Sequence, residues 1–365
     1  MSNLKFAVMG TGNSGQCFAA DIALKGYSVN LAEVPEFENN LKIIDQKGGI
    51  EISGEAGSGF ARMNMITTDL KKAIKGADVI FIGGSAYAHE PFSLALAEHF
   101  EDGQYIVFTS NFGALRFRKW MQSAGNTTRV TPVETMSLLY AVRAPAPGQV
   151  DCVAVKSMLP TAALPCKRTL EFIDKIAPVF PQFKPAPNVW FTSVNNLNPI
   201  VHPPMVLFNA GRIEATGGVG WNLYADGATE SVARVMLAMD DDRMALLKPI
   251  SSEGICFKDA LQTLYADHGI GKNSLSETLR QSPIHSDPAF PAPEAVDTRY
   301  INEDLPFGLS PWASIGRMWR IPTPNLDSVI QMASIMLGRD YFIEGLTVKD
   351  LGIEGMSPED VKAIL

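Results

Sequence analysis

The most constraining feature of this 365-residue sequence is a glycine-rich hexapeptide near its start. Gly10, Gly12 and Gly15 have G-x-G-x-x-G spacing, after an apolar run at residues 4–9 and before a helical stretch at residues 13–25. The first glycine allows a tight turn out of a strand. The second lets the backbone approach a pyrophosphate, and the third lets helix and strand pack closely. The sequence therefore predicts a βαβ unit that binds a dinucleotide.

Three further residues of this βαβ unit belong to the predicted cofactor site. Asn13 and Ser14 open the helix, where backbone N–H groups and the positive end of the helix dipole favour phosphate. Glu33 ends the second predicted strand, 18 positions after Gly15. A carboxylate there suits the ribose 2′-hydroxyl of NAD and repels the 2′-phosphate of NADP. Because no Arg or Lys occurs in residues 34–40, we expect NAD rather than NADP; a solvated strand end is the alternative for Glu33.

The amino-acid composition argues against several classes of binding partner. Hydrophobic residues make up 46% of the chain, charged residues 19%, and the net charge is −8. Nucleic-acid binding needs a concentrated basic face, so we expect no nucleic-acid partner. The sequence has neither a signal-peptide pattern nor a run of about 18 apolar residues, so we expect a cytoplasmic protein without a membrane span. The four cysteines lack C-x-x-C spacing, so no metal site is expected.

The hydrophobic pattern changes near residue 187. Before it, short apolar runs alternate with helical stretches, which predicts an α/β Rossmann-type doubly wound sheet in residues 1–187. Residues 43–66 are interpreted as a hairpin-like insertion. After it, helical periodicity predicts an all-α domain in residues 188–365, with helices at 204–214, 229–247, 257–267, 275–281 and 326–337. The apolar helix at 329–337 could form a homodimer interface, although core packing is the more ordinary use.

Two loops follow predicted strands, at the sheet edge where ligands of such folds bind. The first, residues 83–89, contains Ser85, Ala86 and His89, which we expect to contact the cofactor. The second, residues 109–113, contains Asn111, which we expect to contact the substrate. Small and polar residues there would let the nicotinamide end approach the backbone. Ordinary connecting loops are the alternative.

His202 differs from the other four histidines in its surroundings. It lies in Asn-Pro-Ile-Val-His-Pro-Pro, residues 198–204, followed by a helical run. Pro203 and Pro204 fit the first turn of a helix, so His202 is predicted at a helix N-terminus at the domain junction. An enzyme that transfers hydride needs an acid or base near the reacting carbon, and His202 is the candidate. A capping or buried structural histidine is the alternative.

A second polar segment lies at residues 299–309, Arg-Tyr-Ile-Asn-Glu-Asp-Leu-Pro-Phe-Gly-Leu. Arg299 offers a planar fork for a substrate carboxylate. Asp304 could orient a histidine and fix its tautomer. A surface cluster of ion pairs is the competing interpretation.

These motifs resemble the octopine/nopaline-type opine dehydrogenases. The resemblance covers nearly the whole chain: the glycine motif, the loop ending in His89, the Glu134-Thr135 pair, N-P-x-x-H-P-P and R-Y-x-x-E-D-x-P-x-G-L. The last two motifs are the specific ones. The related ketopantoate reductases and glycerol-3-phosphate dehydrogenases rely on a catalytic lysine, which has no counterpart in residues 195–202.

The resemblance implies a chemistry. An amino acid condenses with a 2-oxo acid such as pyruvate, and NAD(P)H reduces the imine to a secondary amine dicarboxylate. His202 would be the general acid/base, Asp304 its orienting partner, Arg299 the clamp for a carboxylate, and Glu134 part of the amino-acid site. The chain is shorter than the animal octopine enzymes, which leaves arginine open as the substrate. A 2-hydroxy-acid dehydrogenase and a non-catalytic NAD-binding protein are the alternatives.

Overall fold

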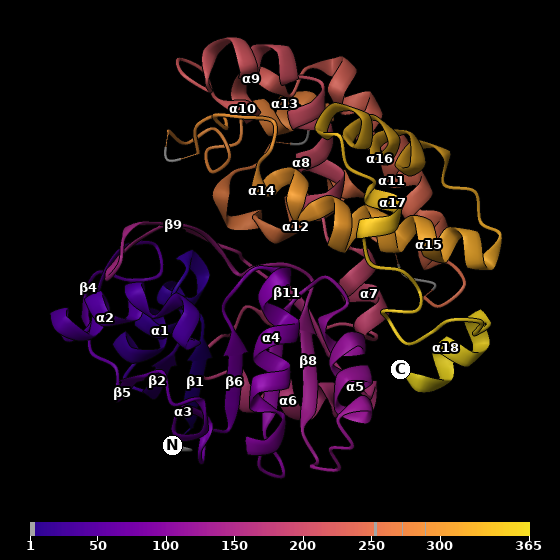
Figure 1. Ribbon diagram of the computed structural model, residues 1–365. Helices are drawn as coiled ribbons and strands as arrows, with labels where there is room; N and C mark the ends of the chain where they lie inside the picture. Colours follow the sequence, from indigo (N-terminus) through magenta and orange to yellow (C-terminus); the bar gives the residue numbers. More distant parts are fainter. Residues whose placement is uncertain (1–3, 252–253, 272, 289) are drawn as a thin grey trace. The chain divides into compact units, whose positions relative to one another are not determined.

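The computed structural model describes residues 4–251, 254–271, 273–288 and 290–365. The chain forms two compact units, Met1–Val189 and Trp190–Leu365. Figure 1 colours them from indigo to magenta and from rose to yellow. Within the described ranges, no helix is long and apolar enough to cross a bilayer. The same ranges contain no group of three or more His, Cys, Asp or Glu side chains that could hold a metal ion.

The first unit is built on an eight-stranded sheet in the order β12-β11-β8-β7-β6-β1-β2-β5. Every neighbouring pair is parallel except β8 and β11. The doubly wound sheet predicted from the sequence is therefore confirmed. Its strands are β1 (Lys5–Met9), β2 (Ser28–Ala32), β5 (Met65–Thr67), β6 (Val79–Ile82), β7 (Tyr105–Thr109), β8 (Thr131–Thr135), β11 (Leu159–Ala163) and β12 (Phe183–Pro185).

Helices cover both faces of this sheet, because successive side chains of a strand point to opposite faces. In β1, Phe6 and Val8 enter one apolar core together with residues of α1 and α6, whereas Ala7 and Met9 enter a second core with residues of α3, α4 and α5. Figure 1 shows α4 and α5 over one face. The helices are α1 (Asn13–Leu24), α2 (Glu38–Lys47), α3 (Leu70–Ile74), α4 (Ala86–Leu96), α5 (Gly113–Ser123) and α6 (Thr169–Ile176), with 3₁₀ turns η1 (Pro35–Phe37), η2 (Ala97–His99) and η3 (Cys166–Arg168).

A second, four-stranded sheet of order β4-β3-β10-β9 belongs to the same unit. The expected hairpin within residues 43–66 is present as the antiparallel pair β3 (Ile50–Gly54) and β4 (Gly59–Ala61). It is not a separate insertion, because β3 also pairs with β10 (Gln149–Val155), which pairs with β9 (Tyr140–Ala146). This sheet was not predicted from the sequence, because β3 and β10 lie about a hundred residues apart in the chain.

The second unit is helical, as expected. It continues from α7 (Val189–Val194) through α8 (Asn198–Leu207), α9 (Ala210–Thr216), α10 (Leu223–Gly227), α11 (Glu230–Leu247), α12 (Phe257–Leu264), η4 (Ala266–His268) and α13 (Leu275–Arg280). It ends with α14 (Arg299–Asn302), the π-helical turn η5 (Leu305–Leu309), α15 (Ser310–Trp319), α16 (Pro324–Leu337), α17 (Tyr341–Glu344) and α18 (Pro358–Ile364).

Two helices begin in segments where the sequence predicted a loop or no helix, and both contain proline beyond their first turn. Helix α4 starts at Ala86, and Pro91 lies inside it. Helix α8 starts at Asn198, with Pro199 in its first turn and Pro203 and Pro204 in its interior. Interior prolines each remove one backbone hydrogen bond, so tertiary packing must hold this part of α8 in helical form.

Candidate active site

The glycine-rich turn packs the start of α1 tightly against the sheet. Gly10 has φ of 101°, in the region that glycine adopts without strain. A Cβ on Gly15 would lie 1.9 Å from the carbonyl oxygen of Gly10, and a Cβ on Gly83 would lie 2.5 Å from Cα of Gly15. Larger residues at Gly15 and Gly83 would therefore push α1 away from β1 and β6.

The N-terminus of α1 fits a dinucleotide phosphate. A Cβ on Gly12 would meet nothing within 4 Å, so the backbone there faces open space. Helix α1 has neither a side-chain cap nor an acidic residue in its first turn, so its positive end is not neutralised. The side chains of Asn13 and Ser14 bond to the backbone of Ala144 and Gly83, and they hold the turn in place.

Glu33 lies at the end of β2 beside this turn. Its Oε2 accepts hydrogen bonds from the backbone N–H of Thr11 at 2.8 Å and from the Thr11 hydroxyl at 2.9 Å. Its Oε1 accepts the N–H of Val34 at 3.0 Å. The carboxylate is buried, which contradicts the alternative of a solvated strand end. Because a carboxylate has about four acceptor positions, Glu33 can also accept a ribose hydroxyl.

The other predicted residues of this unit differ in their placement. Ser85 is half-buried at the start of α4, and the adjacent Ala86 is buried. Asn111 follows β7 in a run of three residues, Ser110, Asn111 and Phe112, with φ of 71°, 62° and 57°. Non-glycine residues adopt this left-handed conformation at a cost of about 1 kcal/mol or more each, so packing must maintain this loop.

Glu134 is completely buried in β8. Its Oε2 accepts the backbone N–H of Ala114 at 3.2 Å, within the first turn of α5. The carboxylate therefore supports the positive end of that helix. Its predicted role in binding the amino acid stays a prediction.

His89 is also completely buried, and its ring lies against Phe108 with 5.1 Å between centroids. Neither ring nitrogen has a hydrogen-bond partner among the described residues. Burial, with a smaller contribution from the charge of Arg116, lowers the pKa of His89 to about 3. This imidazole is enclosed in the core of the sheet domain, and its predicted contact with the cofactor stays a prediction.

The placement of His89 predicts a pH-dependent stability. In the unfolded chain, His89 binds a proton below its ordinary pKa of 6.5. In the folded chain, the same residue binds a proton only below its lowered pKa of about 3. The free energy of unfolding is therefore expected to fall by about 1.4 kcal/mol for each pH unit below 6.5 from this residue alone. Urea unfolding of His89→Leu at pH 7.5 and 5.0 should show about 2 kcal/mol less pH sensitivity than the wild type. His99→Leu, in the adjacent η2, is the control; equal sensitivity in His89→Leu and the wild type would contradict the prediction.

In the helical unit, the structure brings together the two motifs that the sequence analysis singled out. Nδ1 of His202 and Oδ2 of Asp304 lie 2.6 Å apart, although 102 residues separate them in the chain. Both side chains are buried, with 11% and 6% exposed. An ionised carboxylate only accepts hydrogen bonds, so Nδ1 carries the proton and Nε2 of the neutral ring is the basic atom. The orienting role predicted for Asp304 thus agrees with this geometry.

The sequence predicted His202 at a helix N-terminus, but the structure places it inside a helix. It is the fifth residue of α8, and the helix begins at Asn198. The contact between α8 and the π-helical turn η5 is close, because a Cβ on Gly308 would lie 2.3 Å from Cγ of Pro199. The proline of one motif therefore packs on the glycine of the other.

Two tyrosines complete the surroundings of His202. The hydroxyl of Tyr224, in α10, lies 3.0 Å from Nε2. The ring of Tyr300, in α14, lies 4.4 Å from the imidazole between centroids, at an angle of 39°. Sequence reasoning gave neither a role, and for Tyr224 no signal was available, because nothing near residue 224 distinguishes this tyrosine from a core residue.

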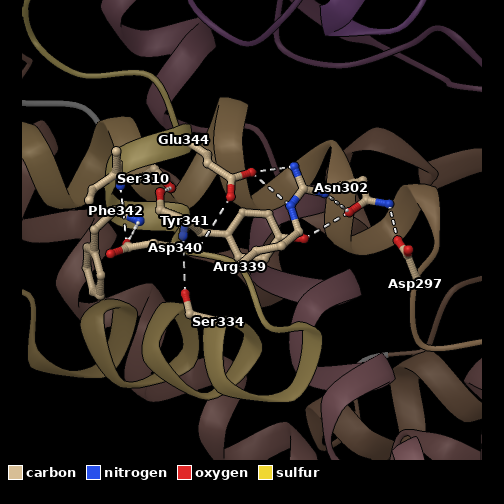
Figure 2. Close-up of polar contacts among 10 residues, drawn as sticks. Asp297, Asn302, Ser310, Ser334, Arg339, Asp340, Tyr341, Phe342 and Glu344 are labelled. Atoms are coloured by element: carbon tan, nitrogen blue, oxygen red, sulfur yellow. Dashed lines mark hydrogen bonds and ion pairs between the residues drawn. The ribbon is translucent and has the colours of Figure 1, made fainter.

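The segment that carries Asp304 is fixed by a polar network, which Figure 2 shows. Asn302, two residues before Asp304, accepts hydrogen bonds at Oδ1 from Arg339 at 3.1 Å and from the Tyr341 hydroxyl at 2.8 Å. Arg339 also bonds to Glu344 through Nε at 2.8 Å. These contacts tie α14 to the turn between α16 and α17, so the position of Asp304 does not depend on local structure alone.

Arg299 lies at the start of α14 with 63% of its side chain exposed. Its Nε lies 3.1 Å from Oε2 of Glu303, whose side chain is 13% exposed. The guanidinium is therefore oriented by one carboxylate while much of it faces solvent. A planar group in this position can bind a second carboxylate in bidentate geometry.

The chain is similar in sequence to known proteins. The family described as NAD/NADP octopine/nopaline dehydrogenase, alpha-helical domain, matches residues 185–337. The chain is 32% identical over 364 residues to the opine dehydrogenase of Arthrobacter sp. (strain 1C), covering 98% of each protein. It is 23% identical over 359 residues to protein ocs of Agrobacterium tumefaciens (strain Ach5), covering 96% of each.

Solved structures share the fold at low identity. An octopine dehydrogenase with NADH and L-arginine superposes with a TM-score of 0.76 at 17% identity, covering 98% of this chain and 97% of that one. A yersinopine dehydrogenase with NADP⁺ superposes with a TM-score of 0.68 at 14% identity, covering 99% and 96%. By its full-length similarity to a curated relative and by its helical domain, this chain belongs to the NAD/NADP-dependent family of octopine/nopaline-type opine dehydrogenases.

Proposed function

We propose that this protein reduces, with NADH, the imine formed between an amino acid and a 2-oxo acid such as pyruvate, and catalyses the reverse oxidation of the secondary amine. The observation that carries the proposal is the buried pair of His202 and Asp304, 2.6 Å apart. A histidine held in one tautomer by a carboxylate can take up and release protons at Nε2. Imine formation needs such a group, because the ketone oxygen must leave as water.

The residues of the first unit would hold the cofactor. The N-terminal turn of α1, from Gly12 to Gly15, would bind the pyrophosphate, and Glu33 would accept the ribose hydroxyls. A bound nicotinamide dinucleotide supplies the hydride for the reduction. Ser85 and Ala86 would line its binding site at the start of α4.

NADH is the proposed cofactor, since the buried carboxylate of Glu33 would repel a 2′-phosphate. The matching family is described as one of NAD/NADP dehydrogenases, and a yersinopine dehydrogenase of similar fold was solved with NADP⁺. The preference for NADH is tested by measuring kcat/KM with NADH and with NADPH. A value for NADH that is equal to or below the value for NADPH would contradict the proposal.

The substrate would be held by its carboxylates. Arg299 offers a guanidinium to one of them, oriented by Glu303. Asn111, with its amide group at the end of β7, is proposed as a further substrate contact, and Glu134 as part of the amino-acid site. These proposed roles assign the binding of the family's substrates to particular residues of this chain.

One assay separates the proposed function from its alternatives. The protein is mixed with NADH, pyruvate and pooled amino acids, and the absorbance of the reduced cofactor is followed. Consumption that requires the amine supports an opine dehydrogenase. Consumption with pyruvate alone would instead identify a 2-hydroxy-acid dehydrogenase. No consumption across a broad panel of amines and 2-oxo acids would favour a binding protein and contradict the proposal.

Arg299→Lys is expected to raise the KM for the carboxylate substrate by about tenfold, because lysine keeps the charge but loses the bidentate fork. The measurement is steady-state kinetics with each substrate varied in turn. Arg317→Lys is the matched control, because Arg317 is a half-exposed arginine of the same domain that pairs with Asp327 at 3.3 Å. An unchanged KM for both substrates in Arg299→Lys would remove Arg299 from the site.

A further inference from the structure

The imidazole of His202 is enclosed by other side chains of the helical domain. Asp304 bonds to Nδ1 at 2.6 Å, and the hydroxyl of Tyr224 lies 3.0 Å from Nε2. The ring of Tyr300 covers one face at 4.4 Å between centroids. Nε2, the atom that must exchange protons, is therefore already bonded to Tyr224. A substrate must either displace that hydroxyl or exchange its proton through it.

The contacts of Tyr224 favour a hydroxyl that stays in place. Asn222 accepts the backbone N–H of Tyr224 at 2.9 Å and that of Ala225 at 2.8 Å, and donates to the carbonyl oxygen of Phe290 at 3.0 Å. The Tyr224 ring packs on His285 with 5.0 Å between centroids. Only 6% of the residue is exposed. A side chain fixed at its backbone and packed at its ring would have to break these contacts to move aside.

We propose that the Tyr224 hydroxyl relays the proton between Nε2 of His202 and the reacting oxygen or nitrogen of the bound substrate. This inference rests on the acid/base role proposed above for His202. When the imidazolium releases its Nε2 proton, the Tyr224 oxygen accepts it while the proton of the hydroxyl passes to the substrate. The phenol is neutral before and after the transfer, and the reverse reaction moves both protons back. A hydroxyl can do this because it donates once and accepts at two positions.

Several charged side chains on helices packed against α8 bond to groups other than His202. Asp240 pairs with Arg243, Asp242 accepts the backbone N–H groups of Asn325 and Leu326, and Arg299 pairs with Glu303. Among the described residues, Asp304 and Tyr224 bond to the His202 ring.

The first test needs no substrate. Tyr224→Phe keeps the ring and its packing on His285 and removes only the hydroxyl oxygen. In ¹⁵N-histidine-labelled protein, we expect the unprotonated Nε2 signal of His202 to move to the position of a nitrogen without a hydrogen-bond donor. The signal is assigned by its loss in His202→Gln. In Tyr105→Phe, which removes a tyrosine hydroxyl bonded to Glu171 in the other domain, the signal should not move. An unmoved signal in Tyr224→Phe would overturn the proposal.

The second test measures turnover. With an amino acid and 2-oxo acid that the wild type converts, Tyr224→Phe should lower kcat by about 100-fold and leave each KM within about threefold. The relay transfers two protons in one step, so a plot of the wild-type rate against the fraction of D₂O should be curved. The residual rate of Tyr224→Phe should depend on it linearly. A role in packing alone would not change this dependence.

The two tests separate the relay from the proposed function. A kcat within threefold of the wild type with the same solvent dependence overturns the relay, even if the NMR signal moves. A wild type that converts no pair of amine and 2-oxo acid contradicts the proposed function instead. The NMR comparison then judges the bond between Tyr224 and His202 by itself.

Discussion

His202→Ala is expected to lower turnover by about 10³-fold while NADH binds with unchanged affinity. The substitution removes the group that would exchange protons with the substrate, and general acid–base groups contribute between about 10² and 10⁴ to rates. The predicted NADH site consists of residues of the other unit, so it should not be affected. The measurements are the steady-state rate and a fluorescence titration with NADH.

The folding of this variant has to be controlled, because alanine leaves the buried carboxylate of Asp304 without its imidazole. An uncompensated buried charge can cost several kcal/mol of stability. His202→Gln fills more of the space and can still donate to Asp304, so it should fold and show the same kinetic loss. His268→Ala, at η4, is the matched control for a histidine outside the pair. Turnover of His202→Gln within a few-fold of the wild type would exclude His202 as the acid/base.

Asp304→Asn should lower kcat by about 10²- to 10³-fold with little change in KM. Asparagine has nearly the same shape, but its amide can also donate a hydrogen bond to Nδ1. Nε2 would then carry the proton in the neutral ring and could no longer accept one, which is the wrong tautomer for a base. The measurement is kcat and KM at several pH values, with the fold checked by circular dichroism.

Asp327→Asn is the matched control, because Asp327 is a carboxylate of the same domain that pairs with Arg317. If Asp304→Asn kept more than a third of the wild-type kcat, the carboxylate would not be needed to orient His202. A large rise in KM with constant kcat would instead assign Asp304 to substrate binding. The two kinetic outcomes therefore separate orientation from binding.

Local sequence patterns were sufficient for the doubly wound sheet of the first unit. A strand, a glycine turn and a helix are neighbours in the chain, and the apolar runs that follow have the lengths and spacing of buried parallel strands. The doubly wound sheet and the position of Glu33 beside the turn could therefore be predicted. The second sheet could not be predicted, because β3 and β10 pair across about a hundred residues and the sequence of one strand does not indicate which strand it pairs with.

The arrangement around His202 and Asp304 depended more on tertiary structure. The sequence identified His202 and Asp304 as separate candidates, and the family resemblance paired them. It placed His202 at a helix terminus, because prolines usually mark one, whereas Pro203 and Pro204 lie inside α8. The burial of the His89 ring against Phe108 was likewise decided by tertiary packing.

The sequence by itself thus determined the dinucleotide turn, the parallel sheet and the type of residue that could move a proton. The tertiary structure alone decided that Tyr224 meets Nε2 of His202 and that Asn302 anchors the segment carrying Asp304. The reason is physical. Glycine conformation and hydrophobic periodicity act over a few residues, whereas contacts between distant side chains depend on how whole helices pack.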